Sequence, residues 1–106
     1  MNKIKVIIKR PDERYGHEAT MTNSLEALQR RVEGYIETIT LGDVVIICNE
    51  EGKLVPLIQN FKLIQGGVQD IIRGTVVVCG HKDEEFSDCP IDMREWRRML
   101  ESWGNR

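Results

Sequence analysis

The stretch VVIICNEEGKL, residues Val44–Leu54, decides the fold class. Its first five residues are apolar and rich in valine and isoleucine, which favours a buried β-strand. The NEEG sequence that follows predicts a hairpin connection, because asparagine and glycine tolerate positive φ angles. Lys53 begins an extended return, in which Pro56 favours an edge position or a bulge. In such a turn Glu50 and Glu51 are both solvated, which makes them weak candidates for a general acid and a general base.

Alternation of apolar and polar residues predicts further extended segments on both sides of this stretch. The expected strands are KIKVIIKR (3–10), GYIETITL (34–41) and DIIRGTVVVCG (70–80). Gly74, inside the last of these, suggests a bulge or a close backbone approach. The polar segment PDERYGHEATMT (11–22) is expected to be an exposed hairpin or loop that carries His17. Residues 60–70, NFKLIQGGVQD, are expected to be irregular, with a flexible Gly-Gly tip.

The sequence NSLEALQRRVEG (23–34) predicts an amphipathic helix. Asn23 and Glu26 have the spacing of a capping box, and the glycine that ends the segment is a natural stop signal. Arg30 and Arg31 lie near the carboxyl end, where the helix dipole favours positive charge. The apolar residues of this segment fall on one helical face: Leu25, Leu28 and Val32.

A second amphipathic helix is predicted by PIDMREWRRMLESWG (90–104), with Pro90 in its first turn and Asp88 as its N-cap. Its apolar face consists of Met93, Trp96, Met99, Leu100 and Trp103. The order of elements is therefore β, α, several β, then α. For 106 residues this predicts a single α+β domain, 1–106, built as a small mostly antiparallel sheet or open barrel with two amphipathic helices.

Composition and charge exclude several classes of function. A net charge of −2 gives no overall attraction to nucleic acid or to an anionic membrane, so neither is expected as a partner. No apolar run approaches the roughly 20 residues that span a bilayer. Three dispersed cysteines, Cys48, Cys79 and Cys89, do not suggest a disulfide framework. We therefore expect a cytoplasmic protein, in the host cell cytoplasm if a phage encodes it.

No catalytic constellation is apparent, so we do not expect an enzyme. The two histidines, His17 and His81, fall in polar segments, and the sequence contains no Gly-x-Ser-x-Gly motif and no P-loop. A hydrolase that uses Cys79 or Cys89 with His81 is kept as a third alternative. These residues lack the fourth ligand and the spacing of a structural zinc site, so we expect neither a metal nor a cofactor.

The sharpest candidate for a binding site is the pair Arg94 and Arg98. At positions i and i+4 they share one helical face, where like charges cost roughly 0.2–0.5 kcal/mol unless an acidic group neutralises them. A phosphate or pyrophosphate would do so through bidentate hydrogen bonds. The alternative is that Glu95 and Glu101 balance the arginines in solvent. Trp96 also has two interpretations, as a core residue or as a surface on which a base stacks.

The segments SLEALQRRVEGYIE, VVIICNEEGKL and DIIRGTVVVCG, with Asn60 between the last two, resemble a family of small proteins from phages and mobile elements. Most of that family is described as a domain of unknown function. The resemblance covers roughly residues 24–80. The chain departs from the family pattern at Phe61, where a basic residue is typical, so no role is carried over to that neighbour of Asn60.

The size, the β-rich body and the arginine-bearing C-terminal helix are also similar to the phage anti-defence sponges of the Thoeris immune system. That resemblance implies a non-enzymatic protein that sequesters cyclic ADP-ribose isomers without cleaving them. It further implies a homo-oligomer with ligand near the subunit interfaces. Paired helix arginines hold the phosphates in this interpretation, and Arg94 and Arg98 are the matching positions.

We therefore expect a binding module for a small cyclic nucleotide. The expected phosphate contacts are Arg94 and Arg98, followed by Arg30 or Arg31. The other expected ligand contacts are Asn49 and Asn60, for base or ribose edges, and Phe86 or Trp96, for stacking. The alternative function is a protein-interaction inhibitor of a host defence enzyme, which binds through the acidic segment DEEFSD (83–88) or through the apolar helix face.

Overall fold

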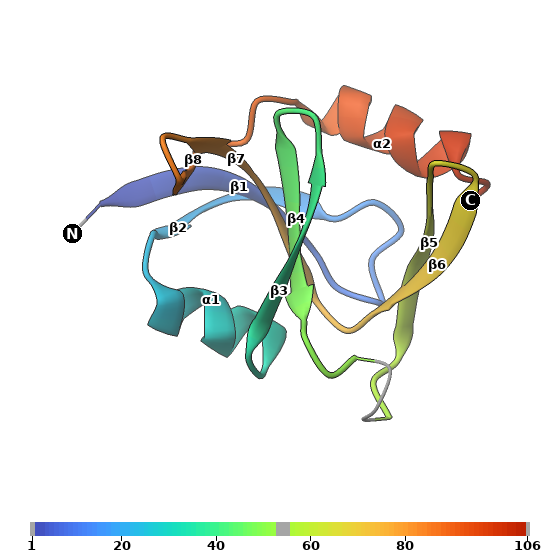
Figure 1. Ribbon diagram of the computed structural model, residues 1–106, viewed down its shortest axis with the longest axis horizontal. Coiled ribbons are helices and arrows are strands. Elements are labelled where there is room, and N and C mark those ends of the chain that lie inside the picture. Colours follow the sequence, from blue (N-terminus) through green and yellow to red (C-terminus); the bar gives the residue numbers. More distant parts are fainter. Residues whose placement is uncertain (1, 53–55, 106) are drawn as a thin grey trace.

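The computed structural model describes residues 2–52 and 56–105, which form a layered arrangement of strands and helices (Figure 1). The elements follow in the order β1 (Lys3–Lys9), β2 (His17–Thr22), α1 (Leu25–Val32), β3 (Ile36–Leu41), β4 (Val44–Asn49), β5 (Gln59–Gln65), β6 (Val68–Arg73), β7 (Val76–Lys82), β8 (Glu85–Ser87) and α2 (Met93–Ser102). The N-terminal end lies at the outer end of β1, and the C-terminal end lies beside the β5–β6 hairpin.

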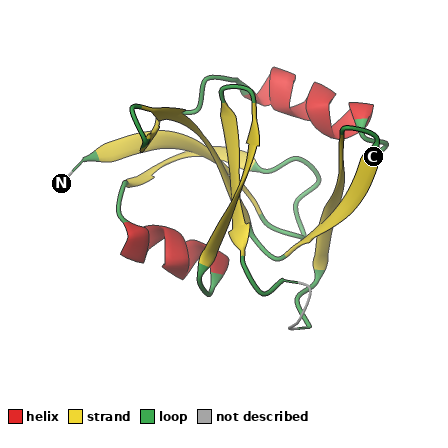
Figure 2. Cartoon of the chain, viewed as in Figure 1, coloured by secondary structure: helices red, strands yellow, loops and turns green. Residues whose placement is uncertain are grey.

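The main sheet has the strand order β2-β1-β7-β4-β3, and β8 pairs with the outer end of β7 (Figure 2). Every pairing in it is antiparallel. All six residues of β4 are buried, as are the first five of β7, because these two strands lie at the centre of the sheet and both of its faces are covered. The sheet stays open, with β2 and β3 as its two edges, so the predicted α+β class with a mostly antiparallel sheet is confirmed.

The helices cover opposite faces of this sheet (Figure 1). Leu28 and Val32 of α1 pack on one face, against side chains of β1, β4 and β7. The other face is covered by α2 together with the β5–β6 hairpin. Burial on both faces explains why β4 and β7 read as continuous valine and isoleucine runs rather than as alternating strands.

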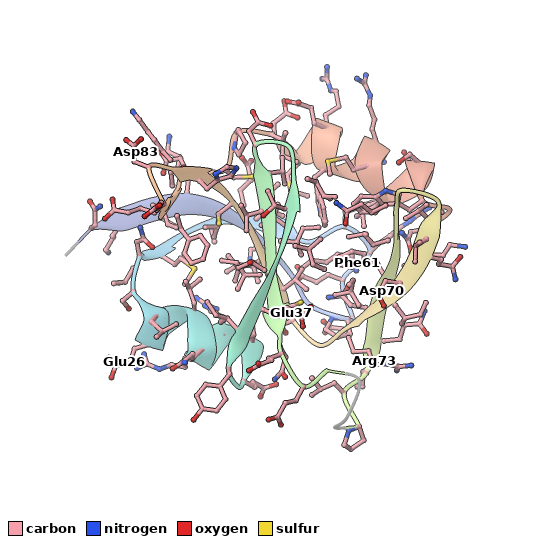
Figure 3. The ribbon with its side chains drawn as sticks, in the orientation of Figure 1. Glu26, Glu37, Phe61, Asp70, Arg73 and Asp83 are labelled. Carbon is pink, nitrogen blue, oxygen red and sulfur yellow. The ribbon has the colours of Figure 1, made fainter. Side chains whose placement is uncertain are left out.

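Three aromatic rings fill the space between α2, the hairpin and the sheet. Phe61 of β5 packs edge-on against Trp96, with ring centroids 5.6 Å apart, and stacks on Trp103 at 6.1 Å (Figure 3). Trp96 has no exposed surface, and its indole N–H donates to the carbonyl oxygen of Tyr15 at 2.8 Å. Trp96 is therefore a core residue with a satisfied polar atom, and no face of its ring is open to a ligand.

Residues 60–70, expected to be irregular, are mostly strand. β5 and β6 form a separate two-stranded hairpin, in which Phe61 and Leu63 are buried. Its tip is Gly66–Gly67, and both residues have positive φ angles (58° and 79°), as a tight two-residue turn requires. Gly74 also has a positive φ of 76°, at the break between β6 and β7.

The connection after β4 differs from the expected hairpin. Val44–Asn49 pairs with β3 and β7, so the NEEG turn does not return the chain beside β4. Residues 53–55, part of the expected extended return, lie outside the described residues. Residues 56–58 have no regular secondary structure, and regular pairing resumes at Gln59. An apolar run after a turn does not by itself specify which strand it joins.

Both helix starts are shifted from the expected residues. Ser24, not Asn23, caps α1 by accepting from the backbone N–H of Ala27 at 3.1 Å. Asp92, not Asp88, caps α2, where it forms a capping box with Glu95. In the described part of the chain, neither helix has the length and apolar character needed to cross a membrane.

Candidate functional site

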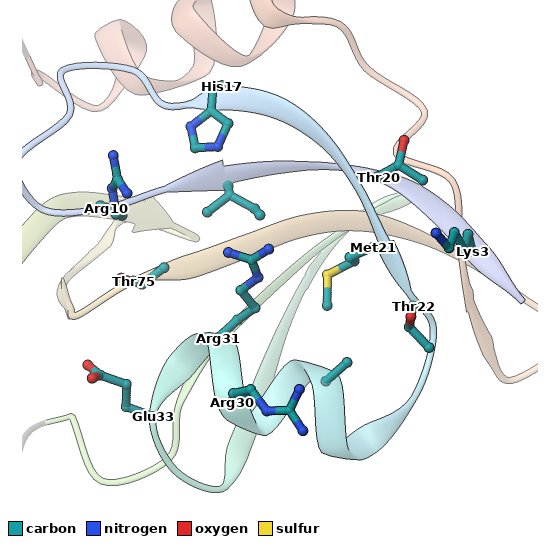
Figure 4. Close-up of a pocket in the computed structure, with 12 residues that line it drawn as sticks. Lys3, Arg10, His17, Thr20, Met21, Thr22, Arg30, Arg31, Glu33 and Thr75 are labelled. Atoms are coloured by element: carbon teal, nitrogen blue, oxygen red, sulfur yellow. The ribbon is translucent and has the colours of Figure 1, made fainter. Parts of the chain in front are cut away.

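A groove between α1 and the β1–β2 edge of the sheet combines a large volume with a concentration of charged side chains. Its volume is about 590 Å³. Figure 4 shows Arg31 extending from α1 toward the strands, with Arg10 and His17 on the opposite wall. The lining residues are Lys3, Ile8, Arg10, His17, Thr20, Met21, Thr22, Ala27, Arg30, Arg31, Glu33 and Thr75. A cavity of this size is typical of small-molecule sites.

The local structure explains how these side chains come together. β2 pairs with β1 so that His17 lies opposite Ile8 and Met21 lies opposite Ile4. Because side chains alternate along a strand, His17 and Met21 lie on the same face, the one that α1 covers. α1 places Arg30 and Arg31 in its last turn, where a positive charge is stabilised by the helix dipole.

The lining of the groove contains more positive than negative side chains. Four cationic side chains line it, against a single carboxylate, that of Glu33, among the described residues. No carboxylate in residues 2–52 and 56–105 forms an ion pair with Arg30 or Arg31. Unpaired guanidinium groups beside a cavity are suited to binding phosphate or carboxylate oxygens through two parallel hydrogen bonds.

The opposite wall is partly neutralised by Glu13. Its carboxylate lies 3.4 Å from Arg10 and 2.7 Å from the His17 ring, and it accepts from the backbone N–H of Arg10 at 3.0 Å. Partial burial acts to raise the pKa of Glu13, but the Arg10 N–H and the His17 ring together hold it below its usual value. Glu13 therefore stays ionised and keeps Arg10 and His17 in position at the end of the groove.

Of the residues expected to contact a ligand, Arg30 and Arg31 are the two that the structure brings together at a cavity. Arg94 and Arg98 are exposed on α2 and do not line this groove. Neither forms an ion pair with a carboxylate in the described ranges, so Glu95 and Glu101 do not neutralise them by direct contact. They remain available to an acidic partner on the open surface.

Asn49 has a structural role that occupies its side chain. It is 8% exposed. Its amide N–H group donates to the carbonyl oxygens of Val32 and Glu33, at 3.0 and 3.3 Å, and its oxygen accepts from the backbone N–H of Glu51 at 2.7 Å. The side chain thus joins the end of α1 to the turn after β4, which leaves little capacity for reading a base or a ribose.

Asn60 is occupied in the same way. Its amide donates to the carbonyl oxygens of Lys9 and Gly74, both at 2.8 Å, and its oxygen accepts from the Lys9 ammonium group. The three bonds tie β5 to β1 and to the break before β7. Asn60 therefore has a structural role, and it lines a separate cavity of about 310 Å³ beside Glu13 rather than the groove at α1. Phe86, proposed for stacking, is partly buried against the core that α1 covers, on the far side of the sheet from α2.

The cysteine chemistry does not match a hydrolase. Cys79 has no exposed surface, and burial raises its pKa to about 12, so its thiolate is not formed near neutral pH. Burial also raises the pKa of Cys89. The His81 ring bonds to the carbonyl oxygen of Gly42 at 3.1 Å rather than to either thiol. Among the described residues, no group of three or more His, Cys, Asp and Glu side chains is placed to hold a metal ion.

The two protein-interaction surfaces proposed from the sequence differ in their exposure to solvent. The apolar face of α2 is part of the core, because Trp96, Leu100 and Trp103 are all buried. The acidic turn between β7 and β8 is exposed, with Asp83 at its outer tip (Figure 3). Glu85 and Asp88 of the same acidic segment are exposed as well, so most of its carboxylates are open to solvent.

Among the basic residues that line the groove, sequence reasoning did not single out Lys3, Arg10 or His17 as ligand contacts. Lys3 and Arg10 belong to residues 1–10, which contain four basic residues and no acidic one. This excess of positive charge was the sequence feature that could have indicated them. No local feature of the sequence indicates that His17 lines the groove, because its place opposite α1 depends on the pairing of β2 with β1.

Comparison with known proteins gives a family without a described activity. The family described as a domain of unknown function, DUF3846, matches residues 4–101. The match extends well beyond the resemblance over residues 24–80 seen in the sequence. The searches of curated proteins and of solved structures returned no match. Since the matched residues make up almost the whole chain, the protein belongs to the DUF3846 family.

Proposed function

We propose that the protein is a non-enzymatic binding module that captures a small phosphorylated ligand, a cyclic nucleotide of the cyclic ADP-ribose type, and holds it in the groove between α1 and β2. One observation supports this most directly: Arg30 and Arg31 face a cavity of about 590 Å³ without an acidic partner in the described residues. A phosphate placed there exchanges water for charge-assisted hydrogen bonds, which are about twice as strong as neutral ones.

Binding without chemistry fits the composition of the groove. Its described lining contains no serine or cysteine nucleophile, and its one histidine is engaged by Glu13. The similarity to the Thoeris anti-defence sponges adds the expectation of a homo-oligomer and of an immune signal as the ligand.

The test is calorimetric titration of cyclic ADP-ribose isomers at low salt into three proteins: the wild type, Arg30→Gln/Arg31→Gln and Arg94→Gln/Arg98→Gln. Loss of one charge-assisted bond costs about 1.5–3 kcal/mol, so the first double variant should lose at least roughly tenfold in affinity. The α2 variant, which has the same change in net charge, should stay within about twofold. Absence of heat with every isomer would sink the proposal, and a larger loss in the α2 variant would move the site to Arg94 and Arg98.

The alternative, inhibition of a host defence enzyme through a protein surface, is supported by the exposed acidic turn. Asp83 and Glu84 both have positive φ angles (50° and 67°), so the turn holds adjacent carboxylates in a conformation unfavourable for those residue types. Mass spectrometry of the protein purified from cells that make the immune signal separates the two functions. An oligomer with bound nucleotide supports capture of a signal, and a ligand-free monomer supports a protein partner.

A further inference from the structure

A second cavity, also of about 590 Å³, adjoins the groove on the other side of the C-terminal end of α1. Its principal lining residues are Gln29, Glu33, Tyr35, Asn49, Glu51 and Leu57. Glu33 lines both cavities, so they meet at this residue. No lysine or arginine is found among the described residues that line the second cavity, in contrast to the groove. The described lining of the second cavity instead supplies an aromatic ring, two side-chain amides and two carboxylates.

Tyr35 gives the second cavity an aromatic wall. It is 67% exposed, just before the edge strand β3. Its backbone is fixed, because its carbonyl oxygen accepts from the N–H of Glu50 at 2.8 Å. An exposed ring on a fixed backbone offers a stacking surface at a small cost in entropy.

Asn49 holds both walls of this cavity in place. Its hydrogen bonds fix the carbonyl groups of Val32 and Glu33 on one wall and the N–H of Glu51 on the other. Gly34 passes so close to Asn49 that a Cβ atom would lie 2.6 Å from the amide nitrogen. The walls are thus set by the folded chain before any ligand arrives, which lowers the cost of binding.

Glu33 lies at the junction in an unusual conformation. It follows the last residue of α1 with φ 61° and ψ 39°, a left-handed conformation in which glycine is the common residue. A carboxylate in an otherwise cationic groove weakens the binding of a bare anion. It is, however, a good acceptor for the paired hydroxyl groups of a ribose, as acidic residues are in dinucleotide sites.

The order of these features matches the order of groups in a nucleotide. Arg30 and Arg31 face the groove, Glu33 lies between the cavities, and Tyr35 faces the second cavity with the amide of Gln29 beside it. We infer that the Tyr35 cavity is a nucleobase subsite, with Glu33 as the acceptor for ribose hydroxyls, so that the ligand class is a nucleoside phosphate rather than a sugar phosphate or an inorganic phosphate. This inference rests on the proposed function and adds the recognition of the base to it.

The experiment compares three probes by calorimetry at low salt: cyclic ADP-ribose, ribose 5-phosphate and pyrophosphate. Stacking of one base on an aromatic ring is worth about 1–3 kcal/mol, so Tyr35→Ala should weaken cyclic ADP-ribose by roughly 5- to 150-fold. The affinities for ribose 5-phosphate and pyrophosphate should stay within about twofold. Tyr35→Phe should retain the wild-type affinity for cyclic ADP-ribose, because it keeps the stacking ring.

Two further variants complete the test. Glu33→Gln should weaken cyclic ADP-ribose and ribose 5-phosphate while leaving pyrophosphate equal or tighter, since it removes a like charge from the groove. Ile64→Ala is the matched control, because this apolar side chain is also exposed (39%) and lies on the β5–β6 hairpin. It should change none of the affinities.

The outcomes separate this inference from the function on which it rests. Cyclic ADP-ribose binding that depends on Arg30 and Arg31 but is unchanged in Tyr35→Ala overturns the base subsite and leaves the phosphate groove intact. Equal affinities of the wild type for cyclic ADP-ribose and pyrophosphate have the same meaning. Absence of binding for all three probes overturns both proposals.

Discussion

Lys9 and Asn60 hold each other through two reciprocal hydrogen bonds. The ammonium group of Lys9 donates to the side-chain oxygen of Asn60, and the Asn60 amide donates back to the Lys9 carbonyl oxygen at 2.8 Å. Lys9 is only 3% exposed, and burial lowers its pKa. The Lys9 ammonium group also donates to the backbone carbonyl oxygen of Glu13 at 2.8 Å, and the carboxylates of Glu13 and Asp12 favour its charge. The Lys9–Asn60 pair joins the first strand of the main sheet to the separate β5–β6 hairpin.

Replacing Asn60 by alanine should therefore destabilise the whole domain. The change leaves the Lys9 ammonium group and two carbonyl oxygens with one partner fewer each, at a cost of about 2–4 kcal/mol in the free energy of unfolding. Urea denaturation followed by far-ultraviolet circular dichroism measures this loss. Gln69→Ala, on the exposed side of β6, is the control and should stay within about 0.5 kcal/mol of the wild type. A similar small change for Asn60→Ala would contradict the structural role given to this residue.

The contact between Gly34 and Asn49 predicts a coupled pair of substitutions. Gly34→Ala places a methyl group 2.6 Å from the Asn49 amide nitrogen, so overpacking should cost about 1–3 kcal/mol. In an Asn49→Ala background the amide is gone, and most of that cost should disappear. The free energies of unfolding of the two single variants and the double variant measure the coupling.

Gly42→Ala is the control for the Gly34 and Asn49 variants. Gly42 has a positive φ of 64° and open space where a Cβ atom would lie, so Gly42→Ala carries only the backbone cost, about 1–2 kcal/mol. This cost should be the same with or without Asn49. If Gly34→Ala and Gly42→Ala were both additive with Asn49→Ala, the steric explanation for Gly34 would be wrong.

The carboxylate of Glu13 predicts a pH dependence of stability. Its pKa is lower in the folded chain than the usual value of 4.5, so the unfolded chain binds more protons between the two values. The stabilisation is fully present above the usual value and is lost as the pH falls through the lowered one. Glu13→Gln should be less stable at pH 7 and should lose less stability on acidification from pH 5 to pH 3.

Urea unfolding of both proteins across that pH range checks this expectation. Glu101→Gln is a suitable control, because Glu101 is exposed on α2 and forms no ion pair within the described residues. Its acid profile should follow the wild type. An identical profile for Glu13→Gln would show that the contacts with Arg10 and His17 carry no net stabilisation.

Alkylation with iodoacetamide should distinguish the three cysteines. Cys48 and Cys79 are buried, and the Cys79 pKa of about 12 leaves almost no thiolate at pH 8. Mass spectrometry of the native protein should therefore show slow modification at Cys89 alone, and three modifications after denaturation. Ligand binding should be indifferent to the reaction. Rapid modification of Cys79 in the native state would revive a thiol-based activity.

Several helices and strands could be predicted from the sequence, because their pattern of apolar residues agrees with the residues that are buried in the fold. The valine and isoleucine run of β4 is buried as expected. The sequence left open whether Trp96 is a core residue, and the structure buries it together with Leu100. The β5 strand was missed although Phe61 and Leu63 alternate with more polar neighbours. The Gly66–Gly67 pair suggested a flexible tip, whereas two adjacent glycines equally suit a tight hairpin.

The location of the candidate site was harder to predict from the sequence, for a physical reason. The spacing of Arg94 and Arg98 predicts a shared helical face, but spacing does not say whether a cavity lies beside it. The groove at Arg30 and Arg31 exists because β2 pairs with β1 and α1 packs across them, which brings His17 opposite the helix. Such long-range pairings leave no local signal in the chain.

The central place of β7 has a consequence for the biogenesis of the protein. β7 joins the β1–β2 hairpin to the β3–β4 hairpin, with Ile7 and Ile46 both opposite Val78, yet it is the seventh of the eight described strands. During synthesis, at about 5–20 residues per second, the two hairpins emerge first and each is only marginally stable alone. Their apolar faces remain uncovered on the ribosome until the last third of the chain appears, so we expect the nascent protein to fold late and to benefit from chaperones that shield hairpins.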